Sequence, residues 1–297
     1  MDLTQSDART FQSATNLLPE KSNLPPSASR SVPLPDSSIK FDPDGLYYDM
    51  SGKKEILIFN HSEYEANEFY GKKPPDERTD HLADYERLEK VFSFFGFKPF
   101  YYENKTYDVI KRTIKAKAEE DHSKTSCLAV AIMTHGLQRG ILCAYDTTYY
   151  LAEMVWLLEN GHSSLVHKPK LFFIQACRGW KVDPGKMTHC DGPNSTVLHV
   201  PRHVDFFIGR STVEDYRAWK YIEGGSWYIR ELCQIFMKHY NHLDLDQMMT
   251  LVTRRVAYDH KSKTLNAPEL TGMKETPEKT STLTKLLKFS HCKPYDD

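Results

Sequence analysis

An apolar run that stops at a reactive side chain is the feature that most limits how this chain can fold. Residues 170–179 read Lys-Leu-Phe-Phe-Ile-Gln-Ala-Cys-Arg-Gly. A short, continuous apolar run of this kind is typical of an interior strand buried on both faces. Cys177 therefore falls at the carboxyl end of a buried strand, where the backbone can turn away. A thiol at such a place can be partly exposed beside positive charge, and these conditions favour the reactive thiolate.

A second apolar run ends on a histidine. Residues 127–134 read Cys-Leu-Ala-Val-Ala-Ile-Met-Thr, and His135 and Gly136 follow, roughly 40 residues before Cys177. The carboxyl ends of strands in an open α/β sheet border the crevice where ligands bind. A thiol and an imidazole in one crevice form the nucleophile and proton-transfer group of a cysteine hydrolase. The alternative is a buried structural cysteine and a surface histidine at a turn. If only one of the two residues were present, this alternative would be the better interpretation.

Size and composition allow one large core and point to no nucleic acid or membrane. The chain has 297 residues, 40% of them hydrophobic, and a formal net charge of −1. No apolar stretch reaches the roughly 18 residues of a membrane span, and the first residues lack the regions of a signal peptide. Six cysteines form no Cys-x-x-Cys pair. We therefore expect free thiols in a reducing, cytoplasmic compartment, with no metal and no cofactor.

The remaining pattern predicts an α/β fold. Residues 1–44 are polar and rich in Ser, Pro and Asp, which indicates a disordered tail. Strands are expected at 56–59, 97–102, 127–134, 141–145, 170–174, 204–208 and 283–289. Helices are expected at 82–95, 107–118, 149–158, 227–240 and 245–258. This alternation predicts a mostly parallel sheet with helices on both faces, interrupted by a Gly/Pro/Asn/Ser-rich stretch at 184–194.

From about Tyr47 to Phe289 the chain resembles the caspases, cytosolic cysteine proteases that cut after aspartate. The run Gln-Ala-Cys-Arg-Gly is a local signature of that family, with a histidine upstream. The other matching segments are Thr134-His135-Gly136, Asp205-Phe206, Ser211-Thr212, Ala218-Trp219 and Gly225-Ser226-Trp227. The short tail without a death-fold module is similar to the executioner group. The resemblance implies a caspase-like sandwich with a six-stranded sheet, and a zymogen cut into large and small subunits.

The resemblance also implies a domain organisation and partners. Residues 1–44 would be the prodomain, 45–191 the large catalytic subunit and 192–297 the small one. Two such heterodimers would form a dimer. Expected partners are protein substrates with aspartate before the cut bond, an upstream caspase activator and inhibitor-of-apoptosis proteins. Cleavage after Asp191, which precedes Gly192, is the best prediction for separating the subunits, because that loop should be accessible. In the tail, Asp36 is the better candidate and Asp44 the second.

The implied mechanism assigns roles to three residues. Cys177 attacks the scissile carbonyl, and His135 protonates the leaving amine and activates water for deacylation. The backbone N–H groups of Gly136 and Cys177 would form the oxyanion hole, where glycine allows close approach to the substrate.

An aspartate side chain needs paired, hydrogen-bonding cations. Caspases build that pocket from two arginines and the glutamine of the cysteine motif, and Arg78 and Gln175 match. The second arginine belongs to a Ser-Trp-Arg segment that pairs with the substrate backbone; here it reads Ala218-Trp219-Lys220. Lys220 keeps the charge but loses the bidentate fork of arginine.

Two further departures concern the outer subsites. Arg217 replaces the aromatic residue that usually lines the second subsite, and residues 259–277 lack the phenylalanines that shape the fourth. Trp219 and Trp227 remain as candidate walls of the fourth subsite, although core packing is the commoner role of tryptophan.

The hypothesis is a cysteine endopeptidase of caspase type, an apoptotic effector activated by proteolytic processing. The alternative is a weakly active or inactive caspase-like regulator that dimerises with or modulates an active caspase. It is supported by Lys220, Arg217 and the altered loop. A relative that prefers Lys or Arg is disfavoured, because it needs an acidic pocket where this chain offers cations.

Overall fold

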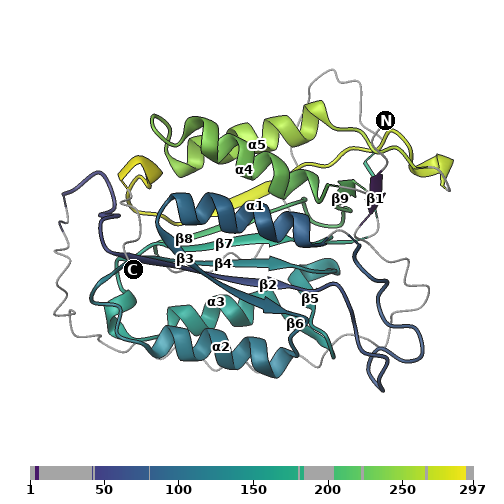
Figure 1. Cartoon of the computed structure of the whole chain (residues 1–297), viewed down its shortest axis with the longest axis horizontal. Coiled ribbons are helices and arrows are strands. Elements are labelled where there is room, and N and C mark those ends of the chain that lie inside the picture. Colours follow the sequence, from purple (N-terminus) through teal and green to yellow (C-terminus); the bar gives the residue numbers. More distant parts are fainter. Residues whose placement is uncertain are drawn as a thin grey trace.

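Six strands form the central sheet of this computed structural model, which describes residues 4–6, 42, 44–79, 81–179, 181–183, 204–221, 224–264 and 267–291. The strand order is β10-β8-β7-β4-β2-β3, and only β10 runs antiparallel to its neighbour (Figure 1). The strands are β2 (Lys53–Asn60), β3 (Phe97–Glu103), β4 (Thr125–Met133), β7 (Lys170–Gln175), β8 (Phe206–Arg210) and β10 (Glu278–Ser281). The predicted mostly parallel sheet is confirmed.

Helices cover both faces of the sheet, as predicted (Figure 1). One face carries α1 (His81–Phe94), α4 (Trp227–His239) and α5 (Leu245–Asp259), and the other carries α2 (Tyr107–Glu119) and α3 (Leu151–Glu159). Three of the helices begin directly after a Thr, Ser or Asp, residue types that cap helix N-termini. The side chains of Thr106, Ser226 and Asp244 accept hydrogen bonds from backbone N–H groups of the first turn.

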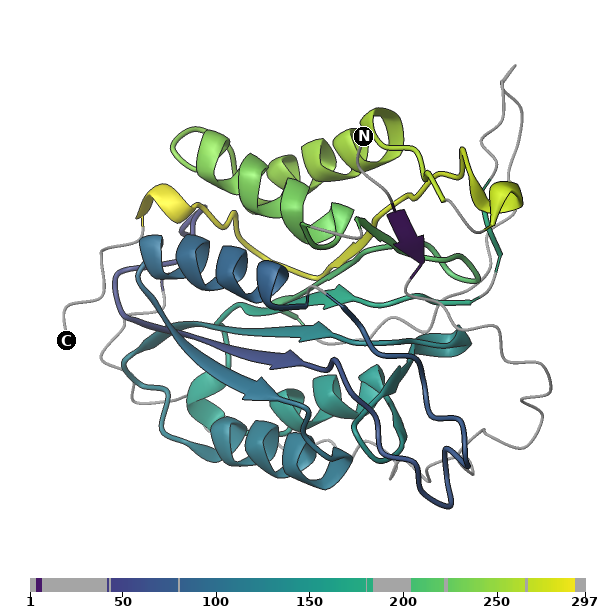
Figure 2. The same cartoon turned by 45° about the vertical axis from the view of Figure 1, so that its right-hand side comes forward.

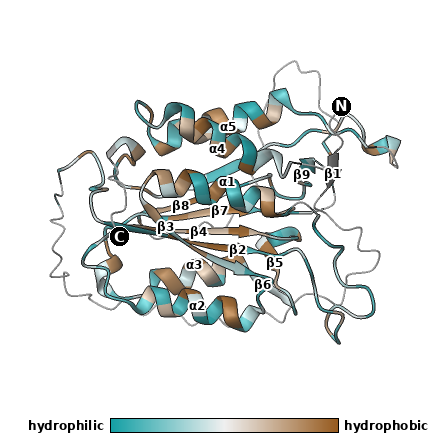
Figure 3. Cartoon of the chain, viewed as in Figure 1, coloured by the Kyte–Doolittle hydropathy of each residue, from teal (hydrophilic) through white to brown (hydrophobic). Residues whose placement is uncertain are grey.

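The interior strands are buried on both faces because their side chains alternate between two apolar layers. In β4, Cys127, Ala129, Ala131 and Met133 pack with α1, α4 and α5, whereas Leu128, Val130 and Ile132 pack with α2 and α3. Strand β7 divides in the same way over its four central residues, so residues 171–174 are all apolar. Figure 3 shows these strands as a hydrophobic band between helices whose outer surfaces are more hydrophilic.

The prediction of a last strand at 283–289 is wrong. The last strand along the chain is β10, which lies at the edge of the sheet beside β8. Its Glu-Lys-Thr-Ser sequence lacks an apolar pattern because an edge strand is less buried. The apolar residues after it pack in the core instead. Leu287 and Phe289 are buried, and the Phe289 ring stacks on Phe95 with centroids 4.5 Å apart.

A small hairpin shortens two other predicted elements, the strand expected at 141–145 and the helix expected at 149–158. Strands β5 (Ile141–Cys143) and β6 (Thr148–Tyr150) pair antiparallel outside the main sheet. The helix expected from 149 therefore begins at Leu151, after β6 has ended.

The tail departs from its prediction at three residues. Thr4–Ser6 form strand β1, which pairs with β9 (Trp219–Tyr221), whereas no regular structure is expected at 1–44. Backbone pairing needs no apolar periodicity, so the sequence pattern carries no sign of it. The predicted processing sites Asp36 and Asp191 lie outside the described residues, while Asp44 is exposed. In the described parts of the chain, no helix combines the length and apolar character needed to cross a bilayer.

Lys170 is a charged residue at the buried start of β7. Its Nζ donates to the carbonyl oxygens of Lys168 (2.7 Å) and Leu165 (3.3 Å) and lies 4.8 Å from the ring centroid of Phe206. Burial lowers the pKa of Lys170 to about 8, although the Asp205 carboxylate opposes the shift. The folded chain therefore holds this proton less tightly than the unfolded chain does.

We predict that Lys170→Met stabilises the chain most near pH 7. Unfolded lysine has a pKa near 10.4, so between about pH 8 and 10.4 the unfolded chain binds more protons. Across that window the free energy of unfolding of the wild type therefore rises with pH relative to that of Lys170→Met. The total rise is about 1.4 kcal/mol for each unit by which the folded and unfolded pKa values of Lys170 differ. Denaturant unfolding of both chains at pH 7, 8.5 and 10 checks this. A stability difference that does not shrink with pH would contradict it.

Candidate active site

His135 and Cys177 lie on two segments that continue side by side beyond their strands. Met133 of β4 pairs with Gln175 of β7, and the Thr134 N–H donates to the Gln175 carbonyl at 3.0 Å. One step further, a Cβ placed on Gly136 would clash with the carbonyl oxygen of Cys177. Only glycine allows this approach, so the two strand ends are in direct backbone contact at Gly136 and Cys177.

The His135 ring is oriented by a backbone carbonyl. Its Nε2 lies 2.8 Å from the carbonyl oxygen of Asp76, which can only accept, so Nε2 carries the proton of the neutral ring. Nδ1 is then the basic nitrogen. The ring also packs against Tyr64, with centroids 5.3 Å apart. Sequence reasoning missed Asp76, because a carbonyl group has no residue-specific signature.

A chain of hydroxyl groups fixes the backbone of His135. The His135 N–H donates to the Tyr64 hydroxyl at 3.0 Å, and the Thr134 hydroxyl donates to the Cys143 carbonyl at 2.7 Å. The Tyr64 hydroxyl therefore donates to Thr134 Oγ1, 2.8 Å away. These bonds tie the histidine to the β5 hairpin and to the loop that follows β2.

Ser211, the residue after β8, fixes the backbone of the cysteine segment. Its hydroxyl donates to the Ala176 carbonyl at 2.9 Å and lies 3.2 Å from the Ala176 N–H, which donates to it. The residue before Cys177 is thus held on both sides of its peptide. Ser211 is one of the residues that carry the resemblance, but its sequence context gives no positioning role.

The expectation of a partly exposed thiol is wrong in this structure. Cys177 is fully buried, and its Sγ accepts a hydrogen bond from the Ala218 N–H at 3.1 Å. The Ala218 carbonyl oxygen also lies 3.7 Å from the sulfur. Polar backbone covers the thiol, because the segment leading into β9 lies directly over it. The thiol is therefore accessible only if that segment moves.

Arg178 supplies less free positive charge than the sequence suggests. Its guanidinium is buried and forms ion pairs with Glu214 and Glu278. The two carboxylates compensate its charge, so Arg178 acts mainly as a link. It joins the cysteine motif to the loop before Arg217 and to strand β10.

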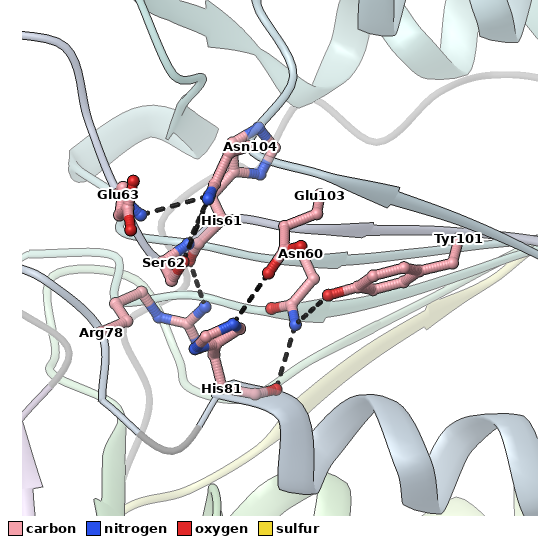
Figure 4. A network of polar contacts seen from close by, with 9 residues as sticks. All are labelled: Asn60, His61, Ser62, Glu63, Arg78, His81, Tyr101, Glu103 and Asn104. Carbon is pink, nitrogen blue, oxygen red and sulfur yellow. Dashed lines mark hydrogen bonds and ion pairs between the residues drawn. The ribbon is translucent and has the colours of Figure 1, made fainter.

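Arg78 lies in a buried polar network beside the end of β2 (Figure 4). Its backbone N–H donates to the Ser62 carbonyl at 2.9 Å, and its Nη1 donates to the His61 carbonyl at 2.8 Å. Burial lowers the pKa of His61 to about 4, and the Arg78 cation adds to this effect. His61 is therefore neutral at pH 7, and its Nε2 donates to the Lys105 carbonyl at 2.9 Å. The loop that carries Arg78 is fixed from several sides.

Lys220 approaches the same loop from β9. Its side chain is buried, and Nζ donates to the carbonyl oxygen of Thr79 at 3.0 Å, next to Arg78 in the chain. Two cationic residues from distant parts of the sequence thus meet near the cysteine and histidine segments. Gln175 is fully buried at the end of β7.

The remaining predicted binding residues have other surroundings. Trp219 and Trp227 are fully buried and stack on each other with centroids 6.2 Å apart, and Trp227 also stacks on His260 at 5.1 Å. They pack in the interior here, so their subsite role stays a prediction. Arg217 is half-buried, and its backbone N–H donates to the Lys181 carbonyl at 3.0 Å.

The fold and the site define a cysteine endopeptidase: an α/β sandwich with a histidine and a cysteine at the carboxyl ends of adjacent strands. The chain belongs to the caspase family, since the family model "Caspase domain" matches residues 53–288.

Relatives and a solved structure agree with this assignment. Caspase drICE of Drosophila melanogaster is 36% identical over 252 residues, which cover 82% of this chain and 72% of that protein. Caspase-1 of Spodoptera frugiperda is 35% identical over 270 residues, covering 89% and 88%. The crystal structure of that Spodoptera caspase-1 matches with a TM-score of 0.74 and 33% identity, covering 85% of this chain and 96% of the solved one.

We predict that Gly136→Ala abolishes activity and destabilises the chain. The added methyl group would meet the backbone of Cys177, which cannot move without displacing the Cys177 thiol, and such overpacking costs about 1–3 kcal/mol. Gly71→Ala is the control for activity, because nothing lies within 4 Å of a Cβ there. Its φ of 69° makes alanine cost about 1–2 kcal/mol of stability, but that chain should keep its activity. Melting temperatures and peptide hydrolysis check the pair. An active, fully stable Gly136→Ala chain would contradict the backbone contact.

Proposed function

We propose that this chain is a caspase that hydrolyses intracellular proteins after aspartate, as a cytoplasmic effector of apoptosis. The observation that carries the proposal is the meeting of His135, oriented by Asp76, with the Cys177 segment beside the cations Arg78 and Lys220. Paired cations suit a short carboxylate side chain.

In the proposed reaction the His135 imidazole moves one proton in each half. His135 takes the thiol proton as the Cys177 sulfur attacks the main-chain carbonyl carbon of the aspartate, and the N–H groups of Gly136 and Cys177 hold the developing oxyanion. His135 then delivers that proton to the leaving amine. In the second half His135 takes a proton from water, which attacks the thioester, and returns it to the departing sulfur, so that the new main-chain carboxyl group of the aspartate and the free thiol are released.

The burial of Cys177 supports a latent uncut chain. The Ala218 N–H donates a hydrogen bond to the Cys177 sulfur. Isolated β-bridges of Lys181 with Tyr216 and of Asp183 with Lys274 anchor the described part of the loop between Cys177 and Ala218. Cleavage after Asp191 would divide this loop and allow the segment at Ala218 to leave the sulfur. Removal of the tail at Asp36 is the proposed second event.

Assembly as a dimer of large/small heterodimers belongs to the same proposal. Strand β10 ends the sheet, with β8 as its only sheet neighbour in the described part of the chain. Its outer edge is where a second copy could extend the sheet. An upstream caspase and inhibitor-of-apoptosis proteins are the proposed regulators.

A second candidate function is a caspase-like regulator with little activity of its own. Two observations favour it: Lys220 replaces a bidentate arginine, and Cys177 is covered by Ala218. Both observations are also compatible with a zymogen, so an experiment must separate the two.

The deciding experiment follows self-processing and hydrolysis in the full chain. Wild-type protein and Cys177→Ala are expressed, sampled by gel and mass spectrometry, and assayed on a library of peptides ending in aspartate. We expect cleavage near Asp191 and hydrolysis after aspartate in the wild type only. A wild-type chain that stays whole, and remains inactive after cleavage at Asp191 by an added caspase, would favour the regulator.

We predict that Lys220→Arg raises kcat/KM on aspartate peptides by about tenfold. The lysine reaches the loop at Thr79 as a single point charge, whereas arginine can bind a carboxylate through two parallel N–H groups. Lys220→Gln is the control, since it loses the charge and should lower kcat/KM. Equal values for all three chains would show that residue 220 does not contact the substrate.

A further inference from the structure

Glu231 on α4 is a buried acid that the proposed reaction does not use. Its side chain is only 4% exposed, and its Oε1 lies 3.0 Å from Nε2 of His260, the residue that directly follows α5. Its Oε2 lies 3.3 Å from Nε of Arg255 on α5. The start of α4 lies beside the end of α5, as the green and yellow-green helices of Figure 2 show. Glu231 therefore joins the two helices at this end of the molecule.

The surroundings of Glu231 keep it ionised. Burial by itself would raise the pKa of Glu231, but the hydrogen bond from His260 and the cations Arg255 and Arg230 hold that pKa below its ordinary value. A carboxylate can only accept hydrogen bonds, so Nε2 of His260 donates to it. The orientation of the His260 ring is thereby fixed.

His260 connects this carboxylate to strand β9. Its Nδ1 lies 2.8 Å from the hydroxyl oxygen of Tyr221, and its ring stacks on Trp227 with centroids 5.1 Å apart. The Trp227 ring in turn contacts Trp219 and Tyr221, each at a centroid distance of 6.2 Å. Lys220, between them in the strand, points the other way and reaches Thr79. The network thus holds one face of β9, opposite the face of Lys220.

We propose that Glu231 and His260 are positioning residues for the outer part of the substrate site. Glu231 fixes the His260 ring, and His260 holds Tyr221 and Trp227 in place. This inference rests on the proposed aspartate-directed function, in which a substrate backbone pairs with β9. It adds the residues that set the affinity for substrate positions far from the cut bond.

The place of Tyr221 in β9 decides which part of a substrate is affected. Ala218 contacts the Cys177 sulfur, and Tyr221 lies three residues further on, about 10 Å along an extended strand. A substrate strand with its aspartate beside the sulfur would reach Tyr221 with residues three or four positions before the cut. Loss of the network should therefore raise KM for long peptides and leave kcat unchanged, because the reacting groups lie elsewhere.

The proposal is tested with two substrates of different length. A tetrapeptide and an acylated dipeptide, both ending in aspartate, are hydrolysed by the active full-length enzyme. Tyr221→Phe and Glu231→Gln should each raise KM for the tetrapeptide about fivefold, the effect of losing one ordinary hydrogen bond, at unchanged kcat. KM for the dipeptide should stay at the wild-type value. Tyr258→Phe is the control, since it removes a hydroxyl group from an exposed tyrosine of α5.

A double variant shows whether both residues act through His260. If they do, Tyr221→Phe with Glu231→Gln should raise KM about as much as either change alone, whereas independent effects would multiply to roughly 25-fold. A purely structural role would lower the melting temperature and raise KM for both peptides alike. Multiplying effects, or equal losses on the two peptides, would overturn the proposal.

A measurement without catalysis separates this inference from the proposed function. In a Cys177→Ala background, hydrogen exchange is followed for peptides that contain residues 219–221. Tyr221→Phe and Glu231→Gln should speed this exchange, and Tyr258→Phe should not. Unchanged exchange and unchanged KM in an active enzyme would overturn the positioning role and leave the protease intact. Inactivity of every chain would overturn the protease, and the exchange would still decide whether the network holds β9.

Discussion

The backbone contact between Gly136 and Cys177 is the constraint on which the rest of this site depends. Two parallel strands normally diverge where their hydrogen bonding ends, yet here the segments after β4 and β7 stay together for several more residues. The Thr134–Gln175 hydrogen bond starts this continuation, and the missing side chain at Gly136 permits the closest step. The hydroxyls of Tyr64 and Ser211 hold each segment from its outer side. The main chains of the histidine and the cysteine are thereby placed by packed backbone, and the Asp76 carbonyl then orients the His135 ring.

The charges around this contact are organised in two groups with different roles. Arg178 is neutralised by Glu214 and Glu278, so it links the cysteine motif to the end strand and to the loop leading to β9. Arg78 and Lys220 instead donate to backbone carbonyls, which carry no full negative charge. The carboxylates of Glu214 and Glu278 thus commit Arg178 to a structural link, although it is next to the proposed nucleophile in the sequence. Under the proposed function, the acid-binding role falls to Arg78 and Lys220.

The sequence was sufficient for the layers and the pairing of the site segments, but not for contacts made through backbone. Runs such as 127–134 and 170–174 have to be interior strands, because both faces of each strand are apolar, and the capping residues Thr106, Ser226 and Asp244 predict where helices begin. The end strand β10 escaped prediction because it is polar, and the run at 283–289 misled because apolar residues can pack in a core without forming a strand. Asp76, Ala218 and β1 act through carbonyl and N–H groups that every residue possesses. No residue pattern could therefore have predicted the orientation of His135 or the covering of Cys177.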